Sequence, residues 1–246
     1  MDNKAEKVKP YNQEDTKKAQ VEKMFDNISH KYDFLNHLLS MGIDIKWRKN
    51  LISMLADKNP SSILDMATGT ADLAIMTAKY IKDARITGLD LSSCMLEIGR
   101  QKLLDKNLAD RIELVHGDSE NMPFMDGTFD AITAAFGVRN YENLLAGLTE
   151  AFRVLKPGGS IFILEFSKPK NSVFRFFYNL YFKFVLPLIG KITSRDPKAY
   201  KYLFESVQAF PAYDEFTAIM DKAGFKSNNY IIQSFGICSI YHGVKL

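Results

Sequence analysis

The stretch His116–Phe136, HGDSENMPFMDGTFDAITAAF, places Asp118 at the end of one apolar run and starts the next at Phe129. A flat purine needs an apolar slot, and its exocyclic amine needs a hydrogen-bond acceptor. Asp118, Ser119 and the turn Met122–Phe124 therefore suit a ligand that contains adenosine. The alternative is a polar loop that only connects two buried strands.

A second loop of small residues lies upstream, after the apolar segment 61–68. It reads DMATGTAD from Asp65 to Asp72, and a residue such as Gly69 lets backbone groups approach a ligand closely. The G-x-G-x-x-G spacing of a nicotinamide site is absent, and one glycine suits a phosphate cradle poorly. The acidic residue that opens the turn favours a cationic ligand, and Asp65 would face an α-ammonium group directly or through water.

Asp90 ends the apolar segment 85–90 and could accept hydrogen bonds from both hydroxyl groups of a ribose. Together with Asp65 and Asp118, it points to S-adenosylmethionine as the ligand. The alternative roles are structural, because Asp65 could cap the following turn and Asp90 could cap the next helix.

Apolar periodicity predicts a regular alternation of strands and helices along the chain. Ser92 is a predicted N-cap, and Lys156–Gly159 is expected to separate a helix from the fifth strand. Continuous apolar strands are typical of buried parallel sheets, so we expect a doubly wound α/β fold with ligands at the carboxyl ends of the strands. The predicted strands are 61–68, 85–90, 112–117, 130–136, 160–166, 226–235 and 237–244, and the predicted helices are 72–80, 94–104, 142–155 and 213–223.

The bulk properties limit the remaining possibilities. With 246 residues and 46% hydrophobic content, the chain can bury one substantial core, and a single domain is expected. A formal net charge of +3 does not indicate a nucleic-acid partner. Cys94 and Cys238 form no metal-ligand or disulfide pattern, which fits a reducing cytoplasm. Residues 1–16 are polar, carry no secretory signal and are expected to be disordered, which leaves 17–246 as the folded domain.

Six motifs in order resemble those of the menaquinone and ubiquinone biosynthesis C-methyltransferases: DMATGTADL, GLDLS, GDSENMPF, FGVRN, RVLKPGG and LEFSKP. VEKMFDNISHKYDFLN, FPAYDEF and GICSIYHG extend the resemblance over nearly the whole chain from Val21. It implies a class I methyltransferase fold, Rossmann-like, with a seven-stranded, mostly parallel sheet whose last strand is antiparallel. It also implies an amino-terminal helical cap at 17–58 and a helical insertion at 170–210 over the substrate pocket.

The resemblance also implies which residues contact S-adenosylmethionine. Two departures from the family pattern stand out. Ala67 and Ala71 occupy positions where many members have glycine, and Ala135 replaces a serine, which puts one polar contact from the fourth strand in question. The cofactor contacts that follow by position are Thr70, Asp90, Asp118 and Ser119.

The implied reaction is C-methylation of a polyprenylated hydroquinone, with demethylmenaquinol favoured over a benzoquinol of the ubiquinone pathway or another small molecule. The ring carbon becomes nucleophilic when the neighbouring phenol, with a pKa of about 10, loses its proton. Arg139 would stabilise the phenolate, unless it forms only a surface ion pair, and Asn140 would orient the ring oxygen. Asp33, or a water between Asp33, Tyr32 and Arg139, is the expected proton acceptor, with His242 as a rival.

The segment Val173–Ile189, VFRFFYNLYFKFVLPLI, is unusually aromatic. Its length and the charges of Arg175 and Lys183 argue against a membrane-spanning helix. A lid over a polyprenyl tail or an interfacial helix fits better, so we expect peripheral membrane association. The alternative is an ordinary buried helix or one that forms a homodimer.

Three other classes of protein fit less well. An RNA or protein methyltransferase would favour an N-P-P-Y turn after the fourth strand, which is absent here, and no basic stripe accompanies that strand. A nicotinamide-dependent reductase lacks its glycine spacing. A non-catalytic adenosine-binding subunit would not need Arg139 and Asn140 behind the cofactor residues. No metal site is expected.

Overall fold

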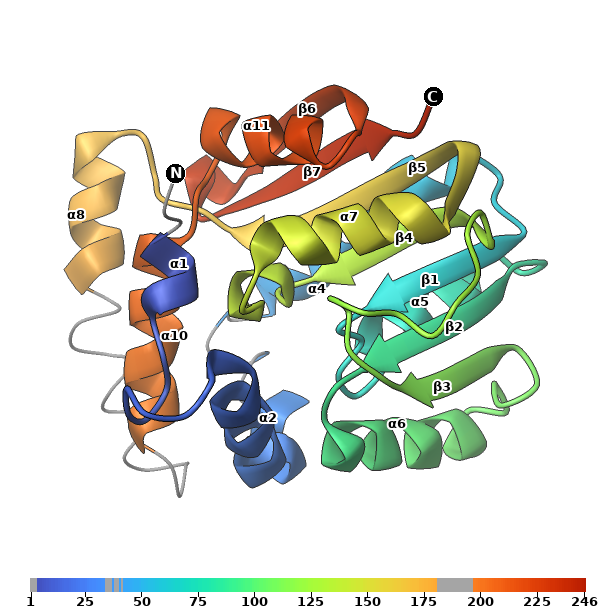
Figure 1. Cartoon of the computed structure of the whole chain (residues 1–246), viewed down its shortest axis with the longest axis horizontal. Coiled ribbons are helices and arrows are strands. Elements are labelled where there is room, and N and C mark those ends of the chain that lie inside the picture. Colours follow the sequence, from blue (N-terminus) through green and yellow to red (C-terminus); the bar gives the residue numbers. More distant parts are fainter. Residues whose placement is uncertain (1–3, 34–36, 38–39, 41, 181–196) are drawn as a thin grey trace.

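The computed structural model describes residues 4–33, 37, 40, 42–180 and 197–246. Its centre is a seven-stranded sheet in the order β3-β2-β1-β4-β5-β7-β6 (Figure 1). Only β7 runs against its neighbours, so the predicted class I methyltransferase topology is confirmed. The strands are β1 (Ser62–Met66), β2 (Arg85–Asp90), β3 (Ile112–His116), β4 (Phe129–Ala135), β5 (Leu155–Phe166), β6 (Lys226–Gln233) and β7 (Cys238–Val244).

Helices cover both faces of the sheet, and each face has its own buried cluster. Alternate residues of a strand point to opposite faces. On β1, Ile63 joins the cluster of α4 and α5, whereas Leu64 joins that of α7 and α11. Burial of each such aliphatic side chain stabilises the folded state by about 1.5–3 kcal/mol relative to leaving it exposed. The helices that flank the sheet are α4 (Ile43–Ala56), α5 (Asp72–Tyr80), α6 (Ser93–Asp105), α7 (Leu144–Val154) and α11 (Asp214–Lys222).

Most element boundaries agree with the sequence prediction. The hydroxyl of Ser92 accepts a hydrogen bond from the amide of Met95 at 3.1 Å, which confirms the predicted cap of α6. Helix α7 begins two residues later than predicted because Asn143 caps it. Strand β5 begins at Leu155 rather than Ser160, since Leu155 pairs with Phe129 and a register shift absorbs the residues between.

The amino-terminal residues differ from the prediction of a disordered tail at 1–16, because residues 4–16 pack against the domain. In α1 (Lys4–Lys7), Ala5 is buried, and its carbonyl accepts a hydrogen bond from the ammonium group of Lys17 at 2.8 Å. The Glu6 carboxylate accepts a hydrogen bond from the amide of Leu144 at 3.1 Å. These contacts reach residues far along the chain, so composition alone could not reveal them.

Four helices gather beyond the carboxyl ends of the parallel strands (Figure 1). They are α1, α2 (Lys17–Ile28), α8 (Ser172–Leu180) and α10 (Pro197–Ala209). The segment 17–58, which was predicted to form one helical cap, therefore occupies two places in the fold. Helix α2 lies at this edge, whereas α4 packs on the sheet through Trp47 and Leu51. Residues 181–189 of the predicted aromatic segment lie outside the described residues. Within the described ranges, no helix has both the length and the apolar character needed to span a bilayer.

Candidate functional site

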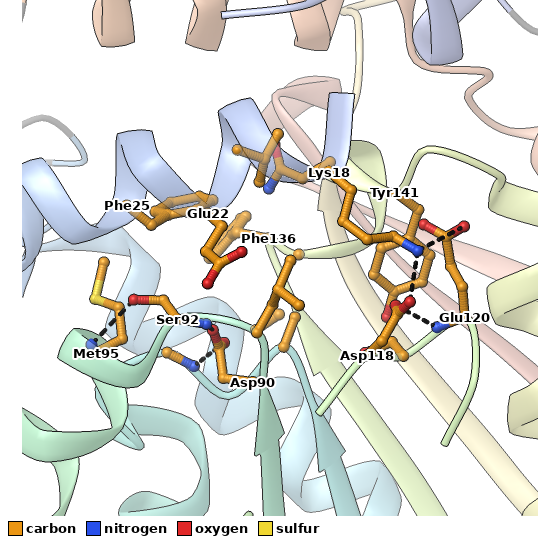
Figure 2. Close-up of a pocket in the computed structure, with 18 of the residues that line it drawn as sticks. Lys18, Glu22, Phe25, Asp90, Ser92, Met95, Asp118, Glu120, Phe136 and Tyr141 are labelled. Carbon is orange, nitrogen blue, oxygen red and sulfur yellow. Dashed lines mark hydrogen bonds and ion pairs between the residues drawn. The ribbon is translucent and has the colours of Figure 1, made fainter. Parts of the chain in front are cut away.

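A pocket lies at the carboxyl ends of the strands, where the chain order reverses on either side of β1. Open α/β sheets bind their ligands at this switch point. Figure 2 shows Lys18, Glu22 and Phe25 reaching into it from α2, opposite Asp90 and Ser92. Six of the predicted site residues are among those that line it: Tyr32, Gly69, Asp90, Asp118, Ser119 and Asn140.

Asp90 is held at the end of β2 by two backbone amides. Its carboxylate accepts hydrogen bonds from the N–H groups of Gly69 at 2.7 Å and Ser92 at 2.9 Å. Gly69 adopts a left-handed φ of 59°, which glycine allows without strain. Burial raises the pKa of Asp90 above its ordinary value. Since a carboxylate has about four lone-pair sites, it can still accept hydrogen bonds from ligand hydroxyls.

Asp118 forms an ion pair across the pocket. The ammonium group of Lys18 lies 2.5 Å from Asp118 Oδ2 and 3.8 Å from a carboxylate oxygen of Glu120. The other oxygen of Asp118 accepts a hydrogen bond from the amide of Glu120 at 2.9 Å. Asp118, the predicted acceptor for the exocyclic amine of adenosine, is therefore already paired with Lys18 of the helix that covers the pocket.

Asp65 lies deeper, in a smaller hollow beside the pocket. It is 1% exposed, and its oxygens accept hydrogen bonds from the hydroxyls of Thr68 at 2.6 Å and Thr133 at 2.7 Å. Burial raises the pKa of Asp65 to about 6. Tyr32 and Gly69 line both the hollow and the pocket, so the two spaces are adjacent.

Thr70 and Asp33 meet in the same hollow. The Thr70 hydroxyl donates to Asp33 Oδ1 at 2.5 Å, and the ammonium group of Lys102 lies 2.6 Å from Asp33 Oδ2. Lys102 also lies 2.6 Å from a carboxylate oxygen of Asp72. Both oxygens of the predicted proton acceptor are therefore engaged by a hydroxyl and a cation.

Arg139 and Asn140 form the short turn η2 (Val138–Asn140) that follows β4. Asn140 faces the pocket, and its side-chain oxygen accepts a hydrogen bond from the Tyr202 hydroxyl at 3.1 Å. Arg139 is buried and is not among the residues that line the two described cavities. Its guanidinium lies 2.9 Å from Glu165, so it forms an interior ion pair and not the surface pair that we considered.

His242, considered as the alternative base, lies away from the pocket. His242, on β7, packs against the Phe162 ring with centroids 4.8 Å apart and is absent from the lining of the described cavities. His30 is exposed in η1 (Ser29–Lys31). His37 Nδ1 lies 2.9 Å from a carboxylate oxygen of Asp44.

The sequence reasoning missed the residues that α2 contributes. Lys18, Glu22 and Phe25 lie at helical spacing on one face of α2, and that spacing was the only available signal. Leu91 and Met95 supply further apolar lining. The lining is acidic overall, because four carboxylates surround one lysine: Glu22, Asp90, Asp118 and Glu120. Such a pocket combines an apolar slot with attraction for a positively charged ligand.

Comparison with known proteins shows the family to which the chain belongs. The family model of the ubiE/COQ5 methyltransferase family matches residues 13–245. A protein of Bacteroides fragilis named demethylmenaquinone methyltransferase is 41% identical over 98% of both chains. A protein of Geotalea daltonii named ubiquinone/menaquinone biosynthesis C-methyltransferase is 44% identical over 93% of this chain and 97% of its own.

Solved structures share the fold at low sequence identity. A SAM-dependent methyltransferase of Thermotoga maritima, described as a possible histamine N-methyltransferase, is 17% identical with a TM-score of 0.64 over 91% of this chain and 99% of its own. A putative methyltransferase of Methanococcus maripaludis is 22% identical with a TM-score of 0.61 over 95% and 96%. Since the family model spans almost the entire sequence and relatives match it nearly end to end, this chain belongs to the ubiE/COQ5 methyltransferase family.

Proposed function

We propose that this protein transfers a methyl group from S-adenosylmethionine to a ring carbon of a polyprenylated hydroquinone, converting demethylmenaquinol to menaquinol. The observation that carries the proposal is the Arg139–Asn140 turn beside an acidic pocket at the switch point of the sheet. The relatives of Bacteroides fragilis and Porphyromonas gingivalis, named demethylmenaquinone methyltransferases, support the naphthoquinol. A benzoquinol is the second candidate, because the Geotalea daltonii relative is named for both pathways.

The residues of the pocket fit S-adenosylmethionine. Asp90 can accept hydrogen bonds from the ribose hydroxyls, and Asp118 and Ser119, which line the same pocket, can accept them from an adenine amine. Phe25, Leu91 and other apolar lining residues offer a slot for a flat base. Thr70, Gly69 and Asp65 border the adjoining hollow, which suits the amino acid end of the molecule. When bound, the cofactor supplies an electrophilic methyl group on a sulfonium.

The protein's own residues prepare the acceptor. Arg139 keeps its positive charge at any working pH and would stabilise the phenolate that makes the ring carbon nucleophilic. Asn140 would orient the ring oxygen from the pocket wall. Because Lys102 and Thr70 engage the Asp33 carboxylate, we assign proton transfer to a water beside Tyr32, which would pass the phenol proton on to solvent while the Asp33 charge stabilises it in transit.

A polyprenyl tail requires an apolar environment, and α8 offers one. Val173, Phe174 and Phe176 expose 61%, 44% and 64% of their surface. The ring of Phe174 stacks on that of Phe235, with centroids 4.5 Å apart. We therefore propose a cytoplasmic enzyme that binds the membrane peripherally through this face, with Arg175 near the headgroups. A homodimer that covers the same face is the alternative.

A methyl-transfer assay tests the function. Labelled S-adenosylmethionine is offered with chemically reduced demethylmenaquinone and, separately, with a reduced benzoquinone precursor, both in detergent. Transfer to the naphthoquinol alone supports the proposal, and transfer to both indicates a dual-pathway enzyme. Transfer to neither, with the cofactor bound, would refute a quinol substrate.

Vesicle co-sedimentation tests the membrane contact. The double variant Phe174→Ser/Phe235→Ser should lose binding to anionic vesicles, because it removes the stacked aromatic pair. Leu104→Ser is the matched control, since Leu104 on α6 is 62% exposed and away from α8. Equal sedimentation of the wild type and the double variant would contradict the proposed face.

A further inference from the structure

Glu165 is a fully buried carboxylate near the end of β5. Its Oε1 accepts hydrogen bonds from Arg139 Nη1 and from the amide of Phe166, both at 2.9 Å. Its Oε2 accepts a hydrogen bond from the backbone amide of Arg139 at 3.3 Å. A buried charge is costly unless it is paired and hydrogen-bonded. Glu165 meets this requirement through the side chain and the backbone amide of Arg139, together with the amide of Phe166.

Hydrogen bonds along one edge of the Arg139 guanidinium and an aromatic ring on one of its faces hold it in place. Nη1 donates to Glu165 and also to the carbonyl of Phe136, and the guanidinium lies over the Phe166 ring at 5.5 Å. Burial lowers the pKa of Arg139, but the charge of Glu165 outweighs this effect and raises the pKa above its ordinary value. Nε is buried and has no hydrogen-bond partner among the described residues. Nε is therefore a guanidinium donor that no described residue satisfies.

A second buried charge holds the same turn from its carbonyl side. Lys17 is fully buried, and its ammonium group donates to the carbonyls of Arg139 at 3.0 Å and Tyr141 at 2.9 Å. The turn that carries Arg139 is thus held by an anion at its amide and by a cation at its carbonyls. Neither Lys17 nor Glu165 lines the described cavities.

We propose that Glu165 is a positioning residue, which holds the η2 turn and orients the Arg139 guanidinium toward the phenolic oxygen of the acceptor. The inference rests on the proposed function for the identity of the acceptor. A preorganised donor stabilises developing charge without reorganising during the reaction. Without Glu165, the turn loses the acceptor for its backbone amide and the guanidinium loses its anchor. A displacement of about 1 Å at such a group can cost about 100-fold in rate.

A double-mutant cycle on turnover tests this role. The variants are Glu165→Gln, Arg139→Gln and the pair together, each measured for kcat, for the KM of the quinol and for cofactor affinity. Glu165→Gln should lower kcat by about 10- to 100-fold, with cofactor affinity unchanged. If Glu165 acts only through Arg139, the double variant should be no slower than Arg139→Gln. Losses that multiply, or an unchanged kcat in Glu165→Gln, would overturn the proposal.

Asp130→Asn is the matched control. The Asp130 carboxylate likewise accepts a backbone amide, that of Ser62 at 2.8 Å, and pairs with Lys156 at 2.7 Å, but at the amino end of β1, on the opposite edge of the sheet from the site. It should leave kcat unchanged. If Glu165→Gln does not fold, Glu165→Asp keeps the charge and withdraws the carboxylate by one methylene. It should show a smaller loss of kcat, and again none in cofactor affinity; full wild-type kcat in this variant would count against the role.

Hydrogen exchange separates this proposal from the proposed function. In Glu165→Gln, the amides of residues 138–141 should exchange faster, while those of 67–70 and 90–92 should keep the wild-type rate. Unchanged exchange at the Arg139 amide would overturn the positioning role whatever the activity. Failure of the wild type to methylate a quinol, with faster exchange at 138–141 in the variant, would refute the acceptor and leave Glu165 as the residue that holds the turn.

Discussion

The ammonium group of Lys18 lies 2.5 Å from a carboxylate oxygen of Asp118 and so ties the helix that covers the pocket to the loop that forms its opposite wall. Farther along α2, the hydroxyl of Ser92 donates to Asp26 Oδ1 at 2.6 Å. Helix α2 is thus held at two points, one on each side of the pocket. A ligand amine that binds Asp118 must share it with Lys18.

The first prediction concerns this ion pair. Lys18→Met should speed dissociation of S-adenosylmethionine by up to about five-fold, since a partly exposed ion pair is worth about 0.2–1 kcal/mol. Stopped-flow measurement of the dissociation rate checks it. Lys23→Met serves as the control, because Lys23 is exposed on the same helix. Equal rates in Lys18→Met and the wild type would show that the ion pair does not hold α2 closed.

The second prediction concerns the carboxylate of Asp90. Asn at this position keeps the shape but has only one acceptor oxygen, so either Gly69 or Ser92 loses its partner and the ligand loses a charged acceptor. Hydrogen bonds to charged groups contribute about 1.5–3 kcal/mol, so affinity for S-adenosylmethionine should fall about 10- to 100-fold. Calorimetry measures this, with the exposed Asp83→Asn as control. An unchanged affinity would remove Asp90 from the binding site.

The third prediction concerns the close approach of two loops. A Cβ atom on Gly137 would lie 2.5 Å from the Cβ of Ala67. Gly137→Ala should therefore destabilise the fold by about 1–3 kcal/mol, as overpacking does. Ala67→Gly should rescue it, since glycine removes the clash and suits the left-handed φ of 50° at that position. Urea unfolding of the single and double variants checks both effects, and a Gly137→Ala variant as stable as the wild type would contradict the close approach.

The fourth prediction concerns the pH dependence of stability. Burial raises the pKa of Asp65 to about 6, above its value of 3.8 in the unfolded chain. Between these values the folded state binds more protons, so the contribution of Asp65 is most favourable below pH 3.8 and declines as the pH rises toward 6. The Asn side chain is neutral at every pH, so the stability of Asp65→Asn should not show this decline. The stability difference between Asp65→Asn and the wild type should therefore be about 3 kcal/mol larger at neutral pH than below pH 3.8.

Unfolding by urea across this pH range measures the effect. The stability difference between wild type and Asp65→Asn should grow from pH 4 to pH 6 and stay constant above it. Thr68 and Thr133 can hydrogen-bond the Asn amide as well as the carboxylate, so the substitution removes the charge without leaving these hydroxyls unpaired. Parallel pH profiles of the two proteins would show that Asp65 titrates at its ordinary value.

Local periodicity was sufficient to predict the strands of the sheet, whereas the antiparallel last strand was implied by the family resemblance. The segments 85–90 and 72–80 coincide with β2 and α5, because a buried strand and an amphipathic helix each leave a repeating apolar pattern. Asp90 and Asp118 could also be predicted to lie near each other, since one ends and the other follows a parallel strand, and the carboxyl ends of these strands meet at one edge. The left-handed φ angles of Ala67 and Ala71 could not be predicted, because a positive φ is associated with glycine and not with alanine.

The sequence by itself therefore determined the class of the fold, the edge of the sheet that carries the site, and the acidic residues at the strand ends. Only the tertiary structure decided which charges meet. Lys17 and Arg139 are 122 positions apart, yet the ammonium group of one holds a carbonyl of the other. The pairs Lys18–Asp118 and Arg139–Glu165 arise in the same way. Periodicity records which face of an element is buried, whereas a hydrogen bond between distant side chains depends on how the elements pack.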